Sequence, residues 1–474
     1  MNALLVSAIL GVLLMLSSVF IKNKSSIHTL ALVGLAVLFV LNLAEINGWL
    51  LFEIDLKGML RFDRYALVMN AIMLASLFFY LLLSGRSMEK VGPHYADYLA
   101  LLFFICAGLF MVTGYTSLLI LFLGIEVISI PLYILTGSDK RNLKSNEAAL
   151  KYFLLGSFST GLLLLGIAFF YGARGNFSAT VAVDPTVVGS SLQLASLLLL
   201  LFAMSFKVSV APFHFWTPDV YDGAPTVFTS FMATIVKVAL SAAFVRLFED
   251  TFSLQFSTWQ PWVAGFAVLT LLIGNLTAVF QQSVKRMLAY SSIAQAGFML
   301  LAVYAINGDS KEGLLLYAAS YSLATIGIFA VLSHLQDYTF EGFNGLAKKQ
   351  PVVAASLAIF FLSLAGIPLT GGFLAKLFMI KAALVYQPWV AIFAVIMAVV
   401  AVFYYFRVIQ AMYFRTADQA SFPEFPKHFP TLLLVTALLL VLLGVFPETI
   451  LGLLYFSSFL QAVHQAFLCV ELFG

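Results

Sequence analysis

The stretch Ser-Leu-Leu-Leu-Leu-Leu-Phe-Ala-Met-Ser-Phe-Lys-Val-Ser-Val-Ala-Pro, from Ser196 to Pro212, places Lys207 inside an apolar run, five residues before a proline. A charged side chain at the centre of a bilayer costs about 2.5–3.5 kcal/mol on insertion scales, and such residues usually face a protein interior or a water-filled cavity. Proline cannot donate a backbone hydrogen bond and disfavours a continuing helix. The stretch therefore predicts a membrane-spanning helix that is interrupted beside a buried cation, a feature typical of ion or proton pathways.

The composition of the whole chain agrees with a membrane setting. Of the 474 residues, 62% are hydrophobic and 10% are charged, and the mean hydropathy is +1.02. Apolar runs of about 20 residues predict an all-α polytopic membrane protein with about fourteen transmembrane helices. The runs lie at 3–21, 28–46, 66–84, 97–113, 115–136, 148–171, 191–211, 226–248, 261–281, 287–306, 312–335, 351–385, 388–412 and 430–455. Lysines follow the first run instead of preceding it, so we interpret that run as a retained span rather than a cleaved signal.

Lysine and arginine are distributed unequally between alternate loops. The odd-numbered loops carry about thirteen cations, against roughly seven in the others. The thirteen are Lys22, Lys24, Arg86, Lys90, Lys140, Arg141, Lys144, Lys285, Arg286, Lys348, Lys349, Arg415 and Lys427. The positive-inside rule then predicts that both termini lie on the outer side of the membrane.

Two apolar regions, 191–231 and 351–385, contain helix breakers. The first contains Pro212, Pro218 and Pro225, and the second contains Pro368 followed by Gly371 and Gly372. Irregular backbone at membrane depth is tolerated only where protein or water satisfies its polar groups, and paired broken helices indicate a transporter built from inverted repeats. We therefore expect two inverted five-helix repeats, each with one broken helix and with hinges at Pro212 and Pro368.

The two expected repeats divide the chain into four parts. We expect three helices in 1–96, a first repeat in 97–250, a second repeat in 251–415, and a final helix with a tail in 416–474.

Four charged residues are expected at membrane depth. Glu126 lies in the middle of one span, Lys207 precedes the first break, Lys237 lies near the centre of another span and Lys376 follows the second break. Desolvation and nearby carboxylates shift a lysine pKa in opposite directions, so moving one acid can switch the base between holding and releasing a proton. We interpret Glu126 and Lys207 as such a pair, although buried charges that only hold helices together are a structural alternative.

Two further residues are candidates for accessory roles. Lys151 lies near a predicted span end, where lysine side chains commonly extend to the interface, and a role in proton transfer is the alternative. His214 follows the first break, where it could relay protons near neutral pH or serve as a hydrogen-bonded structural histidine.

Several other kinds of site are missing from the sequence. The phosphate-binding motif Gly-x-x-x-x-Gly-Lys-Ser/Thr and the dinucleotide motif Gly-x-Gly-x-x-Gly do not occur in a suitable setting, so we expect no ATP or NADH site in this chain. Its two cysteines, Cys106 and Cys469, cannot build an iron–sulfur, zinc or disulfide framework. No sustained basic patch indicates a nucleic-acid partner. We expect no metal site and no redox cofactor in this chain.

Five motifs carry a resemblance to a known family. They are Lys207-Val-Ser-Val-Ala-Pro-Phe-His-Phe-Trp-Thr-Pro-Asp-Val-Tyr-Asp-Gly-Ala-Pro-Thr226, Leu-Gly-Ile-Glu126-Val-Ile-Ser-Ile-Pro-Leu-Tyr, Tyr152-Phe-Leu-Leu-Gly-Ser-Phe-Ser-Thr, Gln281-Gln-Ser-Val-Lys-Arg-Met-Leu-Ala-Tyr-Ser-Ser-Ile-Ala-Gln-Ala-Gly297 and Ala365-Gly-Ile-Pro-Leu-Thr-Gly-Gly-Phe-Leu-Ala-Lys376. Over about residues 100 to 415 the chain resembles the antiporter-like subunits of proton-pumping NADH–quinone oxidoreductase, respiratory complex I. The sequence Phe-His-Phe-Trp-Thr-Pro-Asp-Val-Tyr resembles that of the subunit N branch, which is equivalent to mitochondrial subunit two. The L and M relatives and the Mrp antiporters typically read Leu-His-x-Trp-Leu-Pro-Asp-Ala here.

The resemblance implies a proton-translocating subunit in which Glu126, Lys207, Lys237 and Lys376 form the charged axis of the family. Lys376 argues against subunit M, which usually carries a glutamate there. The segment before Lys237, Ala-Thr-Ile-Val-Lys-Val-Ala, departs from the serine- and proline-containing approach frequent in subunit N, which leaves the local helix geometry open.

The resemblance also implies partners and a location. NADH, FMN, iron–sulfur clusters and quinone would belong to other subunits of the complex, and the chain would lie in a bacterial inner membrane with both termini periplasmic. Related complexes accept NADH or reduced ferredoxin, so the electron donor stays open. The alternatives are an Mrp-type cation/proton antiporter subunit and a structural membrane-arm subunit.

Overall fold

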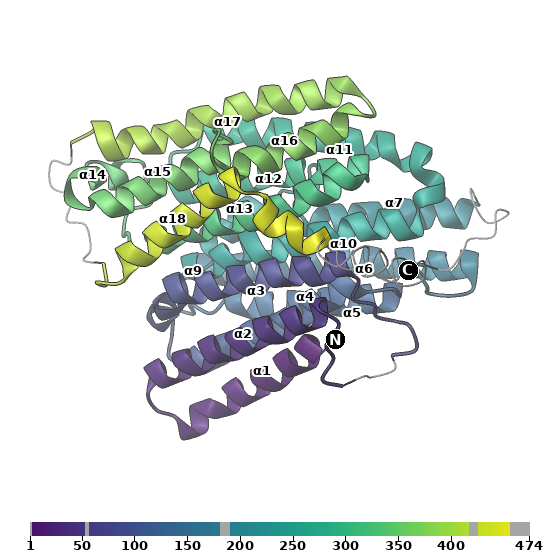
Figure 1. Cartoon of the computed structure of the whole chain (residues 1–474), viewed down its shortest axis with the longest axis horizontal. Coiled ribbons are helices and arrows are strands. Elements are labelled where there is room, and N and C mark those ends of the chain that lie inside the picture. The colour runs from purple at the N-terminus through teal and green to yellow at the C-terminus, as the bar shows by residue number, and fades with distance from the viewer. Residues whose placement is uncertain (1, 53–55, 181–189, 417–424, 456–474) are drawn as a thin grey trace, which may run out of the picture.

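Helices make up almost all of the structure, which is a computed structural model describing residues 2–52, 56–180, 190–416 and 425–455 (Figure 1). No strand occurs in these ranges, only isolated bridges. The N-terminal helices are α1 (Asn2–Phe20), α2 (Lys24–Ile46) and α3 (Arg64–Ser84), followed by the short helix η1 (Gly85–Lys90). In Figure 1, α1 and α2 lie at one end of the molecule and α17 (Pro388–Phe414) lies at the other.

Two five-helix blocks follow. The elements of the first are α4 (Tyr95–Gly114), α5 (Leu118–Thr136), α6 (Leu143–Arg174), α7 (Ser191–Lys207), α8 (Trp216–Gly223), α9 (Thr226–Phe231), η2 (Met232–Val236), α10 (Lys237–Arg246) and η3 (Leu247–Thr251). Those of the second are η4 (Ser253–Gln255), α11 (Phe256–Val279), α12 (Val284–Ala305), α13 (Gly308–Leu332), η5 (Glu341–Phe343), α14 (Leu346–Lys349), α15 (Pro351–Ala365), α16 (Gly371–Leu384) and α17. The last helix, α18 (Phe429–Val445), packs against α13, α15 and α16.

The number of spans agrees with the sequence once the interruptions are considered. Among the described residues, eleven helices are long and apolar enough to cross a membrane, or up to twelve if the bent pair Phe429–Val445 and Glu448–Tyr455 is one span. Two shorter apolar helices, α7 and α15, are the first halves of the predicted broken spans. Counting each broken span once accounts for the fourteen predicted helices.

Polar caps explain where many helices begin. The side chains of Asn23, Asp63 and Asn142 accept hydrogen bonds from backbone N–H groups in the first turns of α2, α3 and α6. Asn307 and Ser310 form a reciprocal capping box at the start of α13. These caps satisfy backbone donors that have no partner inside the helix.

The first interruption separates α7 from α8. Helix α7 ends at Lys207, and the chain continues through Ser209, which has a left-handed φ of 67°, and Pro212, which follows a cis peptide bond. The side chain of Thr270 in α11 accepts a 2.9 Å hydrogen bond from the backbone N–H of Ala211. A neighbouring helix thus satisfies part of the irregular backbone, as a break at membrane depth requires.

The second interruption separates α15 from α16. Gly366 ends α15 in the left-handed region, with a φ of 86°, and Leu369 follows with a φ of 72°. Glycine adopts this conformation without the steric cost of a Cβ atom. The break therefore spans Gly366 to Thr370 and includes Pro368, as the sequence predicted.

A close approach at the second interruption gives a testable result. The side chain of Ser363 accepts a 3.1 Å hydrogen bond from the backbone N–H of Gly372, and a Cβ added at Gly372 would clash with the Ser363 carbonyl oxygen. We expect Gly372→Ala to force α15 and α16 apart and to lower the thermal midpoint of the protein. Gly265→Ala is the matched control, because a Cβ there meets no atom within 4 Å. Equal thermal midpoints for the two variants would contradict this packing.

The helix that carries Lys237 is wound differently just before that residue. Residues Met232–Val236 form a π-helical turn, and α10 begins at Lys237 itself. Turns of this kind are rare and often lie at functional sites. The sequence just before Lys237 departs from the sequence frequent in subunit N, and its local geometry in this structure is a π-helical turn followed by an α-helix.

Candidate functional site

Glu126 and Lys207 are connected through a hydroxyl group rather than by a direct ion pair. The Thr160 hydroxyl in α6 donates a 2.8 Å hydrogen bond to Glu126 Oε1 in α5. Lys207 Nζ, at the end of α7, donates 3.2 Å hydrogen bonds to the Thr160 and Ser129 hydroxyls. No ion pair within 4.0 Å joins these two described residues, so the predicted pair is close but bridged.

Lys237 lies deep in the protein and is held by a neighbouring helix. Its side chain is buried, and Nζ donates to the Ser292 carbonyl oxygen at 3.0 Å and to the Ser292 hydroxyl. The Tyr221 ring of α8 lies 5.6 Å from the ammonium, within cation–π range. Lys237 therefore connects α10 with α12 and with the helix that follows the first interruption.

Lys376 bridges the two halves of its own broken helix. From the second turn of α16, its Nζ donates to the carbonyl oxygens of Leu364 at 2.7 Å and Ala365 at 3.1 Å, at the end of α15. These carbonyls are among those that a helix leaves without partners, and the C-terminal end of a helix dipole favours a cation. The Phe298 ring lies 4.7 Å from Nζ.

A buried polar network extends from α12 to the Lys376 site. Gln295 donates to the Leu364 carbonyl at 3.1 Å, the same oxygen that Lys376 uses, and to the Tyr405 hydroxyl at 3.0 Å. The Tyr405 hydroxyl also bonds the Ser291 hydroxyl at 2.5 Å, and Ser291 is adjacent in sequence to the partner of Lys237. The Tyr317 hydroxyl donates to Gln295. Polar side chains thus occupy much of the interior between two of the buried lysines.

Lys151 takes part in a charged cluster at the start of α6. Its ammonium forms 2.8 Å ion pairs with Glu147 and with Asp219 of α8, and Arg286 of α12 lies 3.3 Å from Asp219. These residues line a pocket of about 240 Å³. Lys151 does not contact Glu126 or Lys207 in the structure; its partners lie at the surface.

His214 lies in the first interruption, between Pro212 and α8. The His214 carbonyl accepts a 2.9 Å hydrogen bond from the Thr217 N–H, and its buried Nδ1 has no hydrogen-bond partner within the described part of the chain. No hydrogen bond there joins it to Glu126, Lys207, Lys237 or Lys376. The structure thus places His214 in the first interruption, apart from the hydrogen bonds of these four residues.

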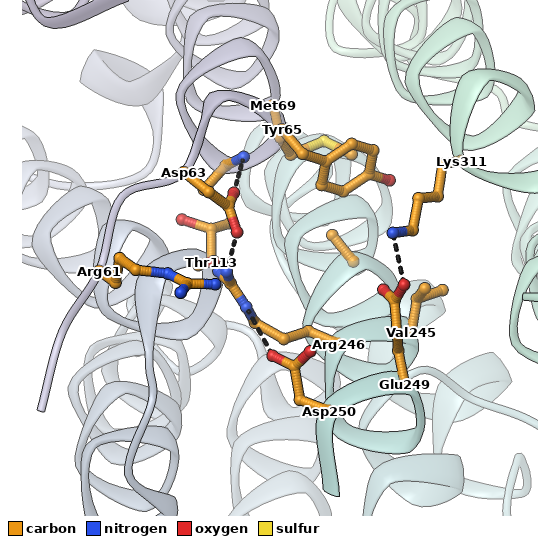
Figure 2. Close-up of a pocket in the computed structure, with 12 residues that line it drawn as sticks. Arg61, Asp63, Tyr65, Met69, Thr113, Val245, Arg246, Glu249, Asp250 and Lys311 are labelled. Carbon is orange, nitrogen blue, oxygen red and sulfur yellow. Dashed lines mark hydrogen bonds and ion pairs between the residues drawn. The ribbon is translucent and has the colours of Figure 1, made fainter. Parts of the chain in front are cut away.

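A second charged pocket lies at the end of the helix bundle opposite to the Lys151 pocket (Figure 2). Arg246, at the end of α10, forms an ion pair with Asp63 before α3 and another with Asp250 at 3.5 Å. Lys311 of α13 pairs with Glu249 at 2.5 Å, and the Tyr65 hydroxyl points into the pocket between them. The pocket has a volume of about 240 Å³ and is lined by residues from the N-terminal helices, α10 and α13.

Sequence reasoning missed several residues of the site. Thr160, Ser292 and Gln295 lie within the motifs that carried the family resemblance, so a signal for them was present. Lys285 was treated as a loop cation, which is wrong: it is buried in the first turn of α12 and donates to the carbonyls of Asp222 at 2.9 Å and Ala224 at 2.7 Å. These carbonyls lie at the end of α8 and just after it, where a cation is favoured.

No group of three or more histidine, cysteine, aspartate or glutamate side chains that could hold a metal ion occurs in the described ranges. Cys106 is a buried free cysteine, whereas Cys469 lies outside the described residues.

The broken helices and the buried charges define a class of protein, the antiporter-like membrane subunits. The family described as "NADH:quinone oxidoreductase/Mrp antiporter, TM" matches residues 115–403, more than half of the chain. In Flavobacterium psychrophilum, the NADH-quinone oxidoreductase subunit N is 35% identical over 462 residues, which cover 96% of this chain and 100% of the relative. The chain therefore belongs to the NADH-quinone oxidoreductase subunit N family.

Solved structures give the same grouping. A chain of respiratory complex I from Thermus thermophilus, solved with bound aureothin, has a TM-score of 0.82 and 30% identity, covering 95% of this chain and 98% of that chain. A chain of the Mrp complex from Dietzia sp. DQ12-45-1b has a TM-score of 0.80 but only 19% identity, covering 95% of both chains, so it shows the fold alone. The predicted all-α fold with inverted repeats and the resemblance to subunit N are confirmed. The protein is a membrane subunit of a proton-translocating NADH–quinone oxidoreductase, and the Mrp-type alternative has less support.

Proposed function

We propose that this chain moves protons through Glu126, Lys207, Lys237 and Lys376 while partner subunits transfer electrons from NADH to quinone. One observation carries the proposal: three lysines lie within or beside apolar helices, and only hydroxyl and carbonyl oxygens accept the hydrogen bonds of their ammonium groups among the described residues. A buried ammonium without a direct carboxylate partner can release its proton more readily than one locked in an ion pair. Neutral acceptors keep each lysine in place in either protonation state.

The order of transfer follows from the packing. Glu126 and Lys207 form the entry pair, because a change at the acid alters the field at the ammonium one hydroxyl away. The proton then passes to Lys237, since α7 packs against α10. The buried hydroxyls of Ser205, two residues before Lys207, and of Ser209, Thr217 and Ser230, between Lys207 and Lys237 in the sequence, have no protein partner in the described ranges. Buried polar groups of this kind are normally satisfied by water, which also conducts protons.

The last step crosses from Lys237 to Lys376. The Ser291, Tyr405 and Gln295 side chains form a series of hydrogen bonds that begins one residue from Ser292, the partner of Lys237, and ends on the Leu364 carbonyl that Lys376 also uses. The hinges at Pro212 and Pro368 would let the half-helices adjust as charges move. The repeats 97–250 and 251–415 would then each contribute one broken helix to the pathway.

The two accessory residues act at the edges of this pathway. Lys151 would gather protons or tune the field at the entry through its surface cluster with Glu147 and Asp219. His214 would act at the hinge, where its buried Nδ1 has no hydrogen-bond partner among the described residues and could take up or release a proton.

Partner subunits supply the redox chemistry and part of the protein surface. NADH, FMN, iron–sulfur clusters and quinone are held by other subunits of the complex. Glu126 is partly exposed on a face of α5 whose neighbours Leu123 and Ile130 are 48% and 53% exposed. A carboxylate facing lipid at this depth is costly, so another subunit of the membrane arm covers this face.

The chain lies in a bacterial inner membrane with both termini on the periplasmic side. The charged pocket at Lys151 lies at the start of α6, and the pocket at Arg246 lies at the end of α10. Spans alternate in direction, and one span separates the spans that hold α6 and α10, so these two pockets face opposite compartments. The excess of loop cations on the side of the Lys151 pocket supports a cytoplasmic location for that pocket.

Purification under mild detergent tests the assignment of partners. We expect the tagged chain to co-purify with redox subunits and with NADH–quinone oxidoreductase activity. Reconstituted alone, it should catalyse little sodium/proton exchange. Robust exchange by the isolated chain, together with absence of redox subunits from the preparation, would favour the Mrp-type alternative.

A further inference from the structure

Thr160 occupies an unusual position between an acid and a base. Its Oγ1 lies 2.8 Å from Glu126 Oε1, 3.2 Å from Lys207 Nζ and 3.1 Å from the Gly156 carbonyl oxygen. The residue is 9% exposed, so water has little access to the hydroxyl. Three helices, α5, α6 and α7, thus meet at one oxygen atom.

The hydrogen count at this oxygen limits what the group can do. A threonine hydroxyl has one hydrogen to donate and two lone pairs to accept, while the lysine ammonium can only donate. Thr160 therefore accepts from Lys207 and gives its single hydrogen either to Glu126 or to Gly156. The first orientation joins the base to the acid, and the second disconnects them while keeping the hydroxyl satisfied.

We propose that the Thr160 hydroxyl carries the proton between Lys207 and Glu126, an inference that rests on the proposed function. In the connected orientation, an N–H bond of Lys207 breaks as an O–H bond forms on Thr160. The original O–H bond of Thr160 breaks in turn as an O–H bond forms on Glu126. The ammonium becomes a neutral amine, the carboxylate becomes a carboxylic acid and the threonine is unchanged; the reverse transfer returns the proton to Lys207, from which it can pass to Lys237.

Rotation of the same hydroxyl controls the connection. When Thr160 donates to the Gly156 carbonyl, Glu126 loses the hydrogen bond from Thr160. The hydrogen-bonded connection between Lys207 and Glu126 is then broken. Lys207 keeps an acceptor in this orientation, because the Ser129 hydroxyl lies 3.2 Å from Nζ. The ammonium can thus hold its proton until the hydroxyl turns back toward the acid.

Two substitutions separate this role from simple packing. Thr160→Val keeps the volume of the side chain but removes the hydroxyl, whereas Thr160→Ser keeps the hydroxyl but removes a methyl group. A proton-carrying role makes the serine variant the more active one, and a packing role makes the valine variant the more active one. Thr436→Val in α18 is the matched control, since that threonine is fully buried and, among the described residues, its hydroxyl bonds only the Leu432 carbonyl of its own helix.

The measurement is the initial rate of NADH-driven proton uptake by the purified complex in liposomes. We expect Thr160→Val to lower it about fivefold or more, a modest part of what positioned proton-transfer groups contribute. Thr160→Ser should retain at least about half of the wild-type rate and Thr436→Val nearly all of it.

Each contrary outcome has a definite meaning. A wild-type rate for Thr160→Val, a serine variant as slow as the valine variant, or an equal loss in Thr436→Val would overturn the inference. Lys207→Met is measured in parallel: if it is slow while Thr160→Val is normal, only the role of Thr160 fails. If Lys207→Met pumps normally, the proposed function itself fails.

Discussion

The Lys207→Met variant is expected to assemble into the complex but to pump protons at no more than about one fifth of the wild-type rate, because the group that accepts and releases the proton is gone. Methionine fills a volume similar to that of the lysine stem, and Lys207 bonds hydroxyl groups rather than a carboxylate, so its removal leaves no directly paired charge behind. The hydroxyls of Ser129 and Thr160 would lose only one donor. NADH oxidation by sealed membrane vesicles, with and without an uncoupler, measures the effect.

A control substitution shows whether the effect is specific to Lys207 or would follow from replacing any lysine. Lys348→Met removes a lysine from the short helix α14, away from the buried charges. It should leave coupled turnover unchanged. Normal coupled turnover in Lys207→Met, with the complex intact, would contradict a role for this residue in proton transfer.

We expect the Lys376→Arg variant to assemble into the complex and to keep the positive charge at this position, but to lose proton pumping. Arginine keeps a positive charge and several donors for the Leu364 and Ala365 carbonyls, so the C-terminal end of α15 stays satisfied. Its guanidinium is effectively always protonated in proteins, so it cannot hand a proton onward. We expect the proton-uptake rate to fall about fivefold or more while the thermal midpoint stays near that of the wild type.

Lys376→Met serves as the comparison for stability. It leaves the Ala365 carbonyl without the side-chain donor that the lysine supplies, and a buried polar group that loses its partner costs about 1–3 kcal/mol. This variant should therefore be both inactive and less stable. If Lys376→Arg pumped normally, the lysine would be a structural cap for the broken helix and not a proton carrier.

Much of this fold could be predicted from sequence, for a physical reason. Apolar runs show where a chain can cross a bilayer, and prolines and glycines show where helices break. The C-terminal ends of α2, α3 and α5 agree with those of their predicted spans, and both breaks fall at the predicted prolines. The four charged residues stood out because each interrupts an apolar run; Lys237 and Lys376 are buried as expected, whereas Glu126 and Lys207 are only partly buried.

The contacts of those charges could not be predicted in the same way. Helices of this chain are apolar on nearly every side, so their sequence does not reveal which face meets which neighbour. The Thr160 bridge, the Ser292 contact of Lys237 and the burial of Lys285 depend on how helices are rotated and packed. The π-helical turn before Lys237 likewise follows from packing rather than from any breaker in Met232–Val236.

The most direct test of the account is the rate of proton uptake by liposomes that contain the purified Lys376→Arg complex, measured together with the rate of NADH oxidation. If buried lysines carry protons by losing and regaining them, this variant should show a strongly reduced proton-uptake rate despite full assembly and a retained positive charge. A wild-type number of protons taken up per NADH oxidised, at a wild-type rate, would show that these lysines act only as fixed charges.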